Sequence, residues 1–181
     1  MPVHLWHDLS AGPNPPDVIY AVIEVPKGSR NKYEYSKRAG VIKLDRVLYS
    51  SLHYPGDYGF IPRSYFEDGD PLDILVMVNE PTFPGCVIEA RPVGVFKMID
   101  KGEPDYKILA VPATDPHFRD YHQLEDIPHH FPREITHFFM TYKQLEGVEV
   151  QNQGWDGAEA AKKTVLSSLQ LYQEKFPPQG L

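Results

Sequence analysis

Residues 67–73 of this chain, with the sequence Glu-Asp-Gly-Asp-Pro-Leu-Asp, place four carboxylates within seven residues. The apolar run 74–78 follows at once, and its length and composition predict a buried strand that holds the acidic stretch at its mouth. Carboxylates this close repel one another unless a proton or a cation lies between them. Hard divalent cations such as Mg²⁺, Mn²⁺ or Ca²⁺ prefer oxygen ligands of this kind. A solvated turn is an equally good interpretation of this stretch alone, since Asp, Gly and Pro are common turn residues.

A second acidic turn strengthens the metal hypothesis. Residues 100–105, Asp-Lys-Gly-Glu-Pro-Asp, lead into the strand-like run 106–111, so the order of acidic turn and buried strand occurs twice. Two such turns that meet at one end of a barrel would form a site with many carboxylates. If both turns were merely solvated, the same order of acidic turn and buried strand would have to arise twice by chance. A metal site is therefore favoured.

Basic and aromatic residues near these turns could face the same site. Lys32 and Glu34 alternate with tyrosines and share one face of a predicted strand. Their spacing alone favours an exposed polar edge over a functional site. Arg46 lies within the strand-like run 41–48, and Tyr142 and Lys143 stand at the end of an apolar helical face.

The pattern of apolar runs predicts a sheet-rich middle followed by two helices. The second of these helices is predicted to open with a capping box of Asp156 and Glu159. This order indicates a mainly β or α+β protein, and our first choice is a five-stranded, OB-like closed barrel flanked by two C-terminal helices, in a single domain over residues 1–181. The predicted strands are 18–25, 32–35, 41–48, 74–78, 87–91, 93–99 and 106–111, residues 54–62 are predicted to be a loop, and the helices are 132–146 and 156–174.

Composition narrows the class of protein. The formal net charge of −7, from 25 acidic and 18 basic residues, disfavours binding to nucleic acid or to an anionic membrane. The single cysteine, Cys86, allows no intrachain disulfide and no metal site built from thiols. Residues 1–10 lack the pattern of a signal peptide, and no apolar run approaches the length of a membrane span. We therefore expect a soluble, cytoplasmic protein.

The chain resembles the family I soluble inorganic pyrophosphatases over almost its whole length. The most specific match is the acidic stretch Asp68-Gly69-Asp70-Pro71-Leu72-Asp73. The resemblance implies the OB-like barrel with flanking helices, and it implies a homo-oligomer, most often a hexamer, with pyrophosphate as the substrate. The other matching stretches are residues 22–26, 32–34, 45–46, 54–59, 91–95, 97–100, 105–107 and 137–143.

The resemblance also implies a role for each candidate residue. The activity would be hydrolysis of pyrophosphate to two phosphates by in-line attack of a metal-activated water, with several Mg²⁺ ions at the site and Mn²⁺ or Zn²⁺ as possible substitutes. The catalytic residues would be Asp70, Tyr58 and Asp105; the phosphates would be bound by Lys32, Arg46, Tyr58, Lys107, Tyr142 and Lys143; and the metal ions would be held by Asp68, Asp70, Asp73, Asp100 and Asp105, with Glu24 and Glu34 in the outer shell.

Two alternatives remain open from the residues. A nucleic-acid-binding barrel would share the fold, but the acidic balance opposes it. A structural calcium module would explain the carboxylates, although not the lysines, the arginine and the tyrosines near them. Release of phosphate from pyrophosphate, with and without Mg²⁺, separates the three hypotheses.

Overall fold

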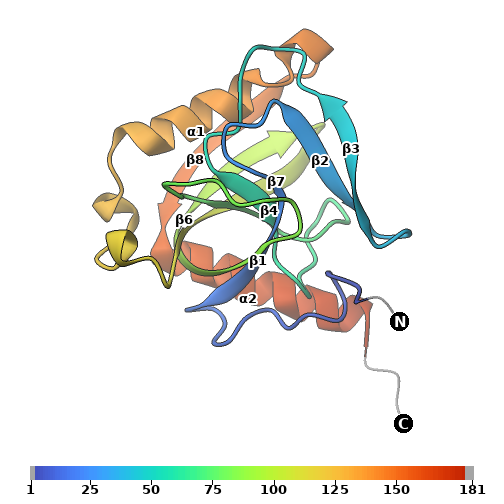
Figure 1. The fold of residues 1–181 in the computed structure, drawn as a ribbon, viewed down its shortest axis with the longest axis vertical. Helices are drawn as coiled ribbons and strands as arrows, with labels where there is room; N and C mark the ends of the chain where they lie inside the picture. The colour runs from blue at the N-terminus through green and yellow to red at the C-terminus, as the bar shows by residue number, and fades with distance from the viewer. Residues whose placement is uncertain (1–2, 178–181) are drawn as a thin grey trace.

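The computed structural model describes residues 3–177 and shows a chain of eight strands and two α-helices (Figure 1). The helices are α1, His130–Thr141, and α2, Ala158–Lys175. Three short 3₁₀ turns cover Pro116–Phe118, Leu124–Asp126 and Gln144–Glu146. The strands are β1 Ile19–Val25, β2 Asn31–Ser36, β3 Val41–Val47, β4 Asp57–Phe60, β5 Asp73–Val76, β6 Val87–Asp100, β7 Glu103–Pro112 and β8 Val150–Gly157.

Five of the strands form a closed ring. They run in the order β1-β4-β5-β7-β6, and β6 pairs back onto β1. All of these pairs are antiparallel except β5 and β7, which are parallel. The predicted fold class, a five-stranded OB-like arrangement with two C-terminal helices, is confirmed. Strand β8 extends the sheet beyond the ring by pairing with β6.

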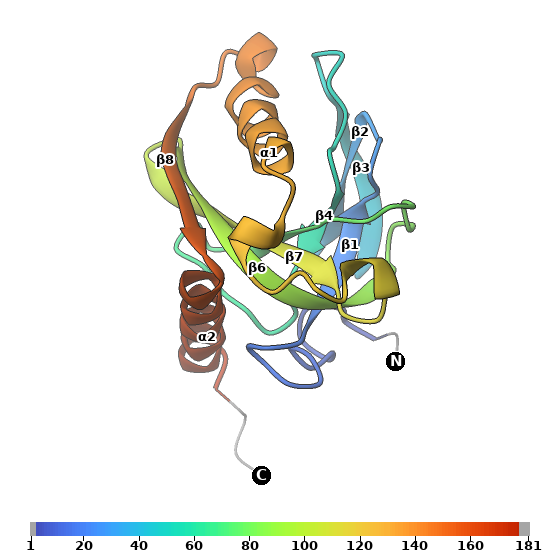
Figure 2. The ribbon, with the colours of Figure 1, turned by 90° about the vertical axis from the view of Figure 1, so that its left-hand side faces the viewer.

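Strands β2 and β3 form a separate hairpin beside the ring (Figures 1 and 2). The hairpin contacts the ring mainly where β2 passes along β1. Its turn includes Gly40, whose φ of 67° suits a residue without a Cβ atom. The hairpin therefore packs against the ring as a separate two-stranded sheet, and its strands are not part of the ring.

Buried apolar side chains fill the ring and the spaces beneath the two helices. One cluster includes Phe96 and Leu109 and extends to Phe139 of α1. A second includes Ile74 and Ile108 and extends to Val165 of α2. Figure 2 shows the helices on different parts of the sheet. Each helix buries one apolar face, which is the usual source of helix stability in small proteins.

Some predicted elements differ from those observed. The two predicted strands 87–91 and 93–99 are one strand, β6, whose register shifts between Pro92 and Gly94. The shift leaves Val93 without a partner on β7, and prolines are tolerated at such bulges, so Pro92 does not end the strand. Strand β4 lies in the predicted loop 54–62. Its Gly59 packs against β1 so closely that a Cβ atom would lie 1.8 Å from the carbonyl oxygen of Val22.

The C-terminal region also differs from its prediction. Strand β8 was not predicted, and it includes Asp156, which pairs with Lys97 of β6 and does not cap the helix. Helix α2 begins at Ala158, with Gly157 as its N-cap and no side-chain cap. Helix α1 ends at Thr141, so the exposed Leu145 lies outside it and outside its apolar face. Within residues 3–177 no helix is long and apolar enough to cross a membrane.

Candidate active site

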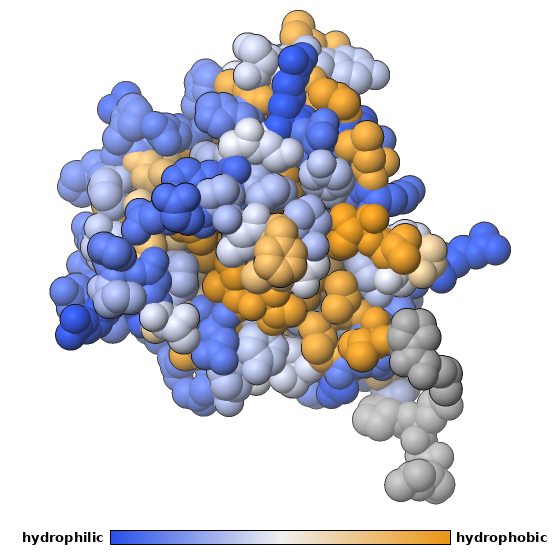
Figure 3. Space-filling model, viewed as in Figure 1, coloured by the Kyte–Doolittle hydropathy of each residue, from blue (hydrophilic) through white to orange (hydrophobic). Residues whose placement is uncertain are grey.

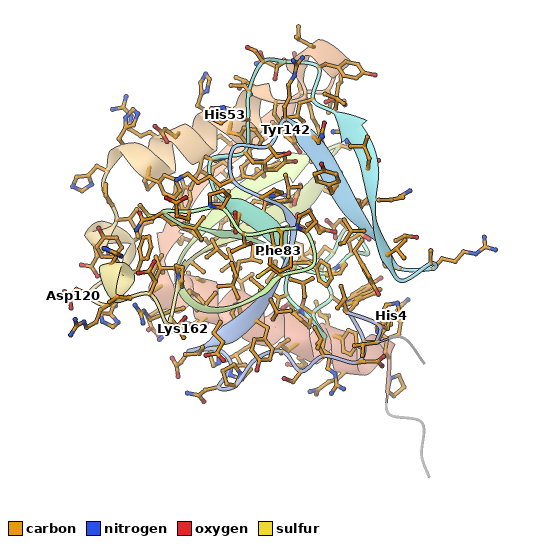
Figure 4. All side chains as sticks on the ribbon, in the orientation of Figure 1. His4, His53, Phe83, Asp120, Tyr142 and Lys162 are labelled. Carbon is orange, nitrogen blue, oxygen red and sulfur yellow. The ribbon has the colours of Figure 1, made fainter. Side chains whose placement is uncertain are left out.

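A small polar cleft lies between one end of the ring, the β2–β3 hairpin and the end of α1. It encloses about 200 Å³, less than the roughly 300–1,000 Å³ that is typical of pockets for drug-sized ligands. All of the predicted site residues except Arg46 line it, namely Glu24, Lys32, Glu34, Tyr58, Asp68, Asp70, Asp73, Asp100, Asp105, Lys107, Tyr142 and Lys143. Figure 4 shows Tyr142 near the upper end of the hairpin.

The first acidic turn is a tight loop, as its Asp, Gly and Pro residues suggested. The backbone N–H of Phe66 donates to the carbonyl of Asp70 at 2.8 Å, and that of Gly69 donates to the carbonyl of Phe66 at 3.0 Å. Gly69 has a φ of 85°, a conformation that favours glycine. The backbone N–H of Asp70 also donates to Asp68 Oδ1 at 3.0 Å. The loop therefore fixes Asp68 and Asp70 at the exposed rim of the cleft.

The buried cation at the centre of the cleft is Lys107. Because β5 and β7 are parallel and Asp73 lies opposite Lys107, the Asp73 carboxylate meets the Lys107 ammonium at 2.5 Å. Asp105, two residues earlier on the same strand, is 2.7 Å away. Lys107 also donates to the hydroxyl of Tyr58 at 3.0 Å. Burial alone would lower the pKa of Lys107, but Asp105 and Asp73 outweigh it and hold that pKa well above its usual value.

The second acidic turn brings Asp100 into contact with Lys143. The ammonium of Lys143 pairs with Asp100 Oδ2, whereas Asp100 Oδ1 is buried without a hydrogen-bond partner among the described residues. Tyr142, next to Lys143, is the C-cap of α1 and is 5% exposed. Burial raises the pKa of the Tyr142 hydroxyl, so it stays neutral and can donate a hydrogen bond.

Glu24, Glu34 and Lys32 enter the cleft from β1 and β2. The backbone N–H of Tyr35 donates to Glu24 Oε1 at 2.7 Å, which ties the hairpin to the ring. Burial raises the pKa of Glu24 to about 8 in spite of this hydrogen bond. Lys32 is 3.3 Å from Asp45 across the hairpin. The preference for an exposed polar edge, drawn from the spacing of Lys32 and Glu34, was therefore wrong, since both line the cleft.

Arg46 is the one predicted site residue outside the lining of the cleft. It lies opposite Lys32 in the hairpin, and its guanidinium is 2.6 Å from Asp45. Its Nε is 2.7 Å from Glu146 Oε1, without the alignment of a hydrogen bond. The sequence carried no signal for Glu146, because one hundred residues separate it from Arg46.

Lys37 lines the cleft although the sequence did not single it out. It lies in the turn between β2 and β3, and its ammonium pairs with the carboxylate of Asp70. Tyr35 and Phe60, whose rings are 5.6 Å apart, also line the cleft. No pattern of spacing could have indicated Lys37, since a lysine in a hairpin turn is usually a solvated residue.

The donor set fits divalent metal ions, although it forms no closed cage. Across residues 3–177 no three acidic, histidine or cysteine side chains converge on one point. Mg²⁺ keeps several waters and is usually held by one or two carboxylates, so it requires no such cage. The buried, unpartnered Asp100 Oδ1 is an oxygen that a cation could use. Partial burial and the nearby carboxylates raise the pKa of Asp68 to about 7, which indicates that the cleft has an excess of negative charge.

A family model and the similar proteins of known function all point to one family for this chain. Residues 21–173 match the family model described as inorganic pyrophosphatase. An inorganic pyrophosphatase of Haloferax volcanii is 54% identical over 175 residues, covering 96% of this chain and 99% of that protein. A soluble inorganic pyrophosphatase of Chlamydomonas reinhardtii is 47% identical over 178 residues, covering 98% and 93%.

The solved structures agree with this assignment. The crystal structure of inorganic pyrophosphatase from Thermus thermophilus superposes with a TM-score of 0.91 at 44% identity, covering 94% of this chain and 99% of that one. One family thus accounts for the sequence, the closed ring of strands and the residues of the acidic turns. The chain belongs to the inorganic pyrophosphatase family.

Proposed function

We propose that the protein hydrolyses inorganic pyrophosphate with Mg²⁺ as its cofactor, and that the residues of the cleft described above carry out the reaction. The activity follows from the family, whose members hydrolyse pyrophosphate to two phosphates and depend on metal ions. The observation that carries the proposal is the mixture of carboxylates and lysines in a single small cleft. A site of that kind suits a small, highly charged anion that arrives with cations.

The substrate would be bound by cations and hydroxyl donors from separate elements. Lys107 and Lys143 would act as point charges on phosphate oxygens, and the neutral hydroxyl of Tyr142 would donate a hydrogen bond. Lys32 and Arg46 would approach from the hairpin. Arg46 would break its ion pairs with Asp45 and Glu146 and bind a phosphate group in their place. Its planar guanidinium can bind two phosphate oxygens at once.

The metal ions would be held by the two acidic turns. Asp68 and Asp73 would contribute from the first turn, Asp100 and Asp105 from the second, and Asp70 would be shared, with Glu24 and Glu34 farther out. Bound Mg²⁺ would supply positive charge that neutralises phosphate oxygens and lowers the pKa of water. The exposed rim position of Asp70 leaves its carboxylate accessible to water.

Asp70 would take the proton of the attacking water. The water adds to one phosphorus, the bridging P–O bond breaks in line with it, and the second phosphate leaves with the electron pair of that bond. Tyr58 and Asp105 would orient the reacting groups through Lys107, which contacts both of them. Positioning and electrostatics supply most of the acceleration in phosphoryl transfer.

Assembly, domain organisation and location form a second part of the proposal. We propose one functional domain over residues 1–181, and the cytoplasm as its compartment, because the single Cys86 requires no oxidising environment. We also propose a homo-hexamer, as the family resemblance implies. Phe83 is 66% exposed at the centre of the face in Figure 4, where Figure 3 shows apolar side chains gathered, and a subunit contact would cover it.

The activity is tested by release of phosphate from pyrophosphate in Mg²⁺ and in EDTA, with Asp70→Asn as the matched variant. We expect release only with Mg²⁺, and a loss of about 10²–10⁴-fold in kcat for the variant, because asparagine keeps the shape but cannot accept the proton. Absence of release from folded wild-type protein would refute the activity. Near-normal turnover of the variant would remove Asp70 as the base.

Arg46→Lys tests whether Arg46 binds phosphate. Lysine keeps the charge but loses the planar group that binds two oxygens at once. We therefore expect KM for pyrophosphate to rise or kcat to fall by about tenfold or more. Arg38→Lys, an exposed arginine in the hairpin turn, is the control and should leave both constants unchanged. Equal kinetics for Arg46→Lys and the wild type would show that Arg46 only joins Asp45 to Glu146.

Glu24→Gln tests the raised pKa of Glu24 in metal-free protein. The pKa of Glu24 is about 8 in the folded state and 4.5 in the unfolded chain. At pH values between these two, Glu24 is protonated in the folded protein and ionised in the unfolded chain. The wild type should therefore lose stability as pH rises from about 4.5 to 8, by at most about 1.4 kcal/mol per pH unit from this group. Glutamine keeps the oxygen that accepts from Tyr35 and removes the titration.

The measurement is urea unfolding in EDTA at several pH values between 5 and 8, with wild type and variant at one protein concentration. The variant should show the shallower fall in the free energy of unfolding. Parallel curves would mean that Glu24 is ionised in the folded protein, as it would be at its ordinary pKa.

The hexamer is tested by light scattering at micromolar protein concentration. A chain of 20.7 kDa should give a particle six times that mass. Substituting Phe83 by Asp should shift the particle to a smaller mass if Phe83 lies in a subunit contact, because an aspartate buried in an apolar contact is unfavourable. A monomeric wild type would contradict the proposal.

A further inference from the structure

Lys37 is the one lysine of the cleft for which the proposed reaction has no use. Its ammonium pairs with the carboxylate of Asp70 from the turn of the β2–β3 hairpin. Lys107 and Lys143 also pair with carboxylates of the cleft, but their side chains are only 4% and 15% exposed. The Lys37 side chain is 40% exposed and that of Asp70 is 53% exposed. This pair therefore lies in water at the entrance of the site.

The N-terminal segment 4–8 positions Lys37. The ring of His4 lies with its Nε2 2.9 Å from the carbonyl oxygen of Lys37, and the Lys37 ammonium stands 5.2 Å from the centre of the Trp6 ring. The backbone N–H of Leu5 donates to the hydroxyl of Tyr35 at 3.0 Å. Figure 4 shows His4 below the turn of the hairpin. The segment thus contacts both the backbone and the side chain of this turn.

The same segment is anchored to the chain that leads into the first acidic turn. Trp6 is 4% exposed, and its Nε1 donates to the carbonyl of Ser64 at 2.8 Å. The backbone N–H of Arg63 donates to the carbonyl of Trp6 at 2.9 Å. Residues 4–8 therefore bridge the hairpin turn, which carries Lys37, and the segment that leads to Asp70. The fold therefore keeps the two charges close together through hydrogen bonds of this segment, of which the one between Trp6 and Ser64 is buried.

We propose that Lys37 is an internal cation that competes with a divalent metal ion for Asp70 and so sets the metal affinity of the site. The inference rests on the proposed function, in which Asp70 is shared between metal ions. An ammonium and a metal ion that use the same carboxylate oxygens exclude each other. Since exposed ion pairs contribute little free energy, Lys37 yields to the ion.

Titration calorimetry of Mg²⁺ into the protein, without pyrophosphate, tests this inference. Lys37→Gln should bind the first Mg²⁺ roughly two- to fivefold more tightly than the wild type, because the competitor is gone. Arg38→Gln is the matched control: it removes the same charge from the next residue of the turn, and Arg38 forms no ion pair among the residues that the structure describes. It should leave the affinity within experimental error.

Two further variants test the positioning role of the N-terminal segment. His4→Ala removes the contact with the Lys37 carbonyl and should tighten Mg²⁺ binding in the same direction as Lys37→Gln, by a smaller factor. His117→Ala is the matched control: it removes an exposed histidine whose ring contacts Asp115 outside the cleft, and it should have no effect on Mg²⁺ binding.

The outcomes separate this inference from the proposed function. Equal or weaker Mg²⁺ binding by Lys37→Gln, beside measurable binding by the wild type, would overturn the inference alone. So would a gain in affinity of the same size in Arg38→Gln, since net charge would then explain it. Absence of any Mg²⁺ binding by folded wild-type protein would refute the cofactor of the proposed function, and the inference with it.

Discussion

The structure depends on the buried contact of Lys107 with Asp73 and Asp105. A lysine that is 3% exposed is tolerated only when carboxylates compensate for its lost hydration. Asp73 opens β5 and Lys107 lies opposite it in β7, so the only parallel pair among the ring strands sets the distance between the two charges. A shift of one residue in this register would turn Lys107 away from Asp73. The strand register that closes the ring therefore also places these charges at the centre of the cleft.

The cleft keeps more negative charge than its own lysines can balance. Burial and neighbouring charges raise the pKa of Glu24 to about 8 and that of Asp68 to about 7, so both groups resist ionisation in the protein alone. Such groups are unfavourable for folding, and they persist because apolar packing elsewhere holds the strands in place. Cations that bind the cleft remove this repulsion, and binding is thereby favoured. In the proposed function, this unfavourable charge would favour the binding of Mg²⁺ ions to the cleft.

The sequence predicted the parts of the molecule that depend on local pattern. Continuous apolar runs indicated most of the ring strands, and two acidic turns indicated the cleft. Strand β4 escaped prediction because Gly59 and its neighbours resemble a loop, although the glycine is required by close approach to β1. Strand β8 is polar and exposed at an edge, so it has no apolar signature. The Arg46–Glu146 contact depends on tertiary packing, which no local pattern encodes.

The cleft brings together groups from elements with different attachments. The carboxylates and Lys107 come mostly from the ring and its loops, whereas Lys32 and Arg46 come from a hairpin with its own two-stranded sheet. Side chains on a continuous sheet keep their distances through backbone hydrogen bonds, but those of the hairpin rely on contacts with the ring. Tyr35 makes three of the contacts that connect the two parts: its backbone N–H donates to Glu24, its ring packs on Phe60, and its hydroxyl accepts from Leu5 of the N-terminal segment. Tyr35 is 4% exposed and lines the cleft without any charge. An uncharged residue thus contributes to the orientation of the hairpin cations toward the carboxylates of the ring.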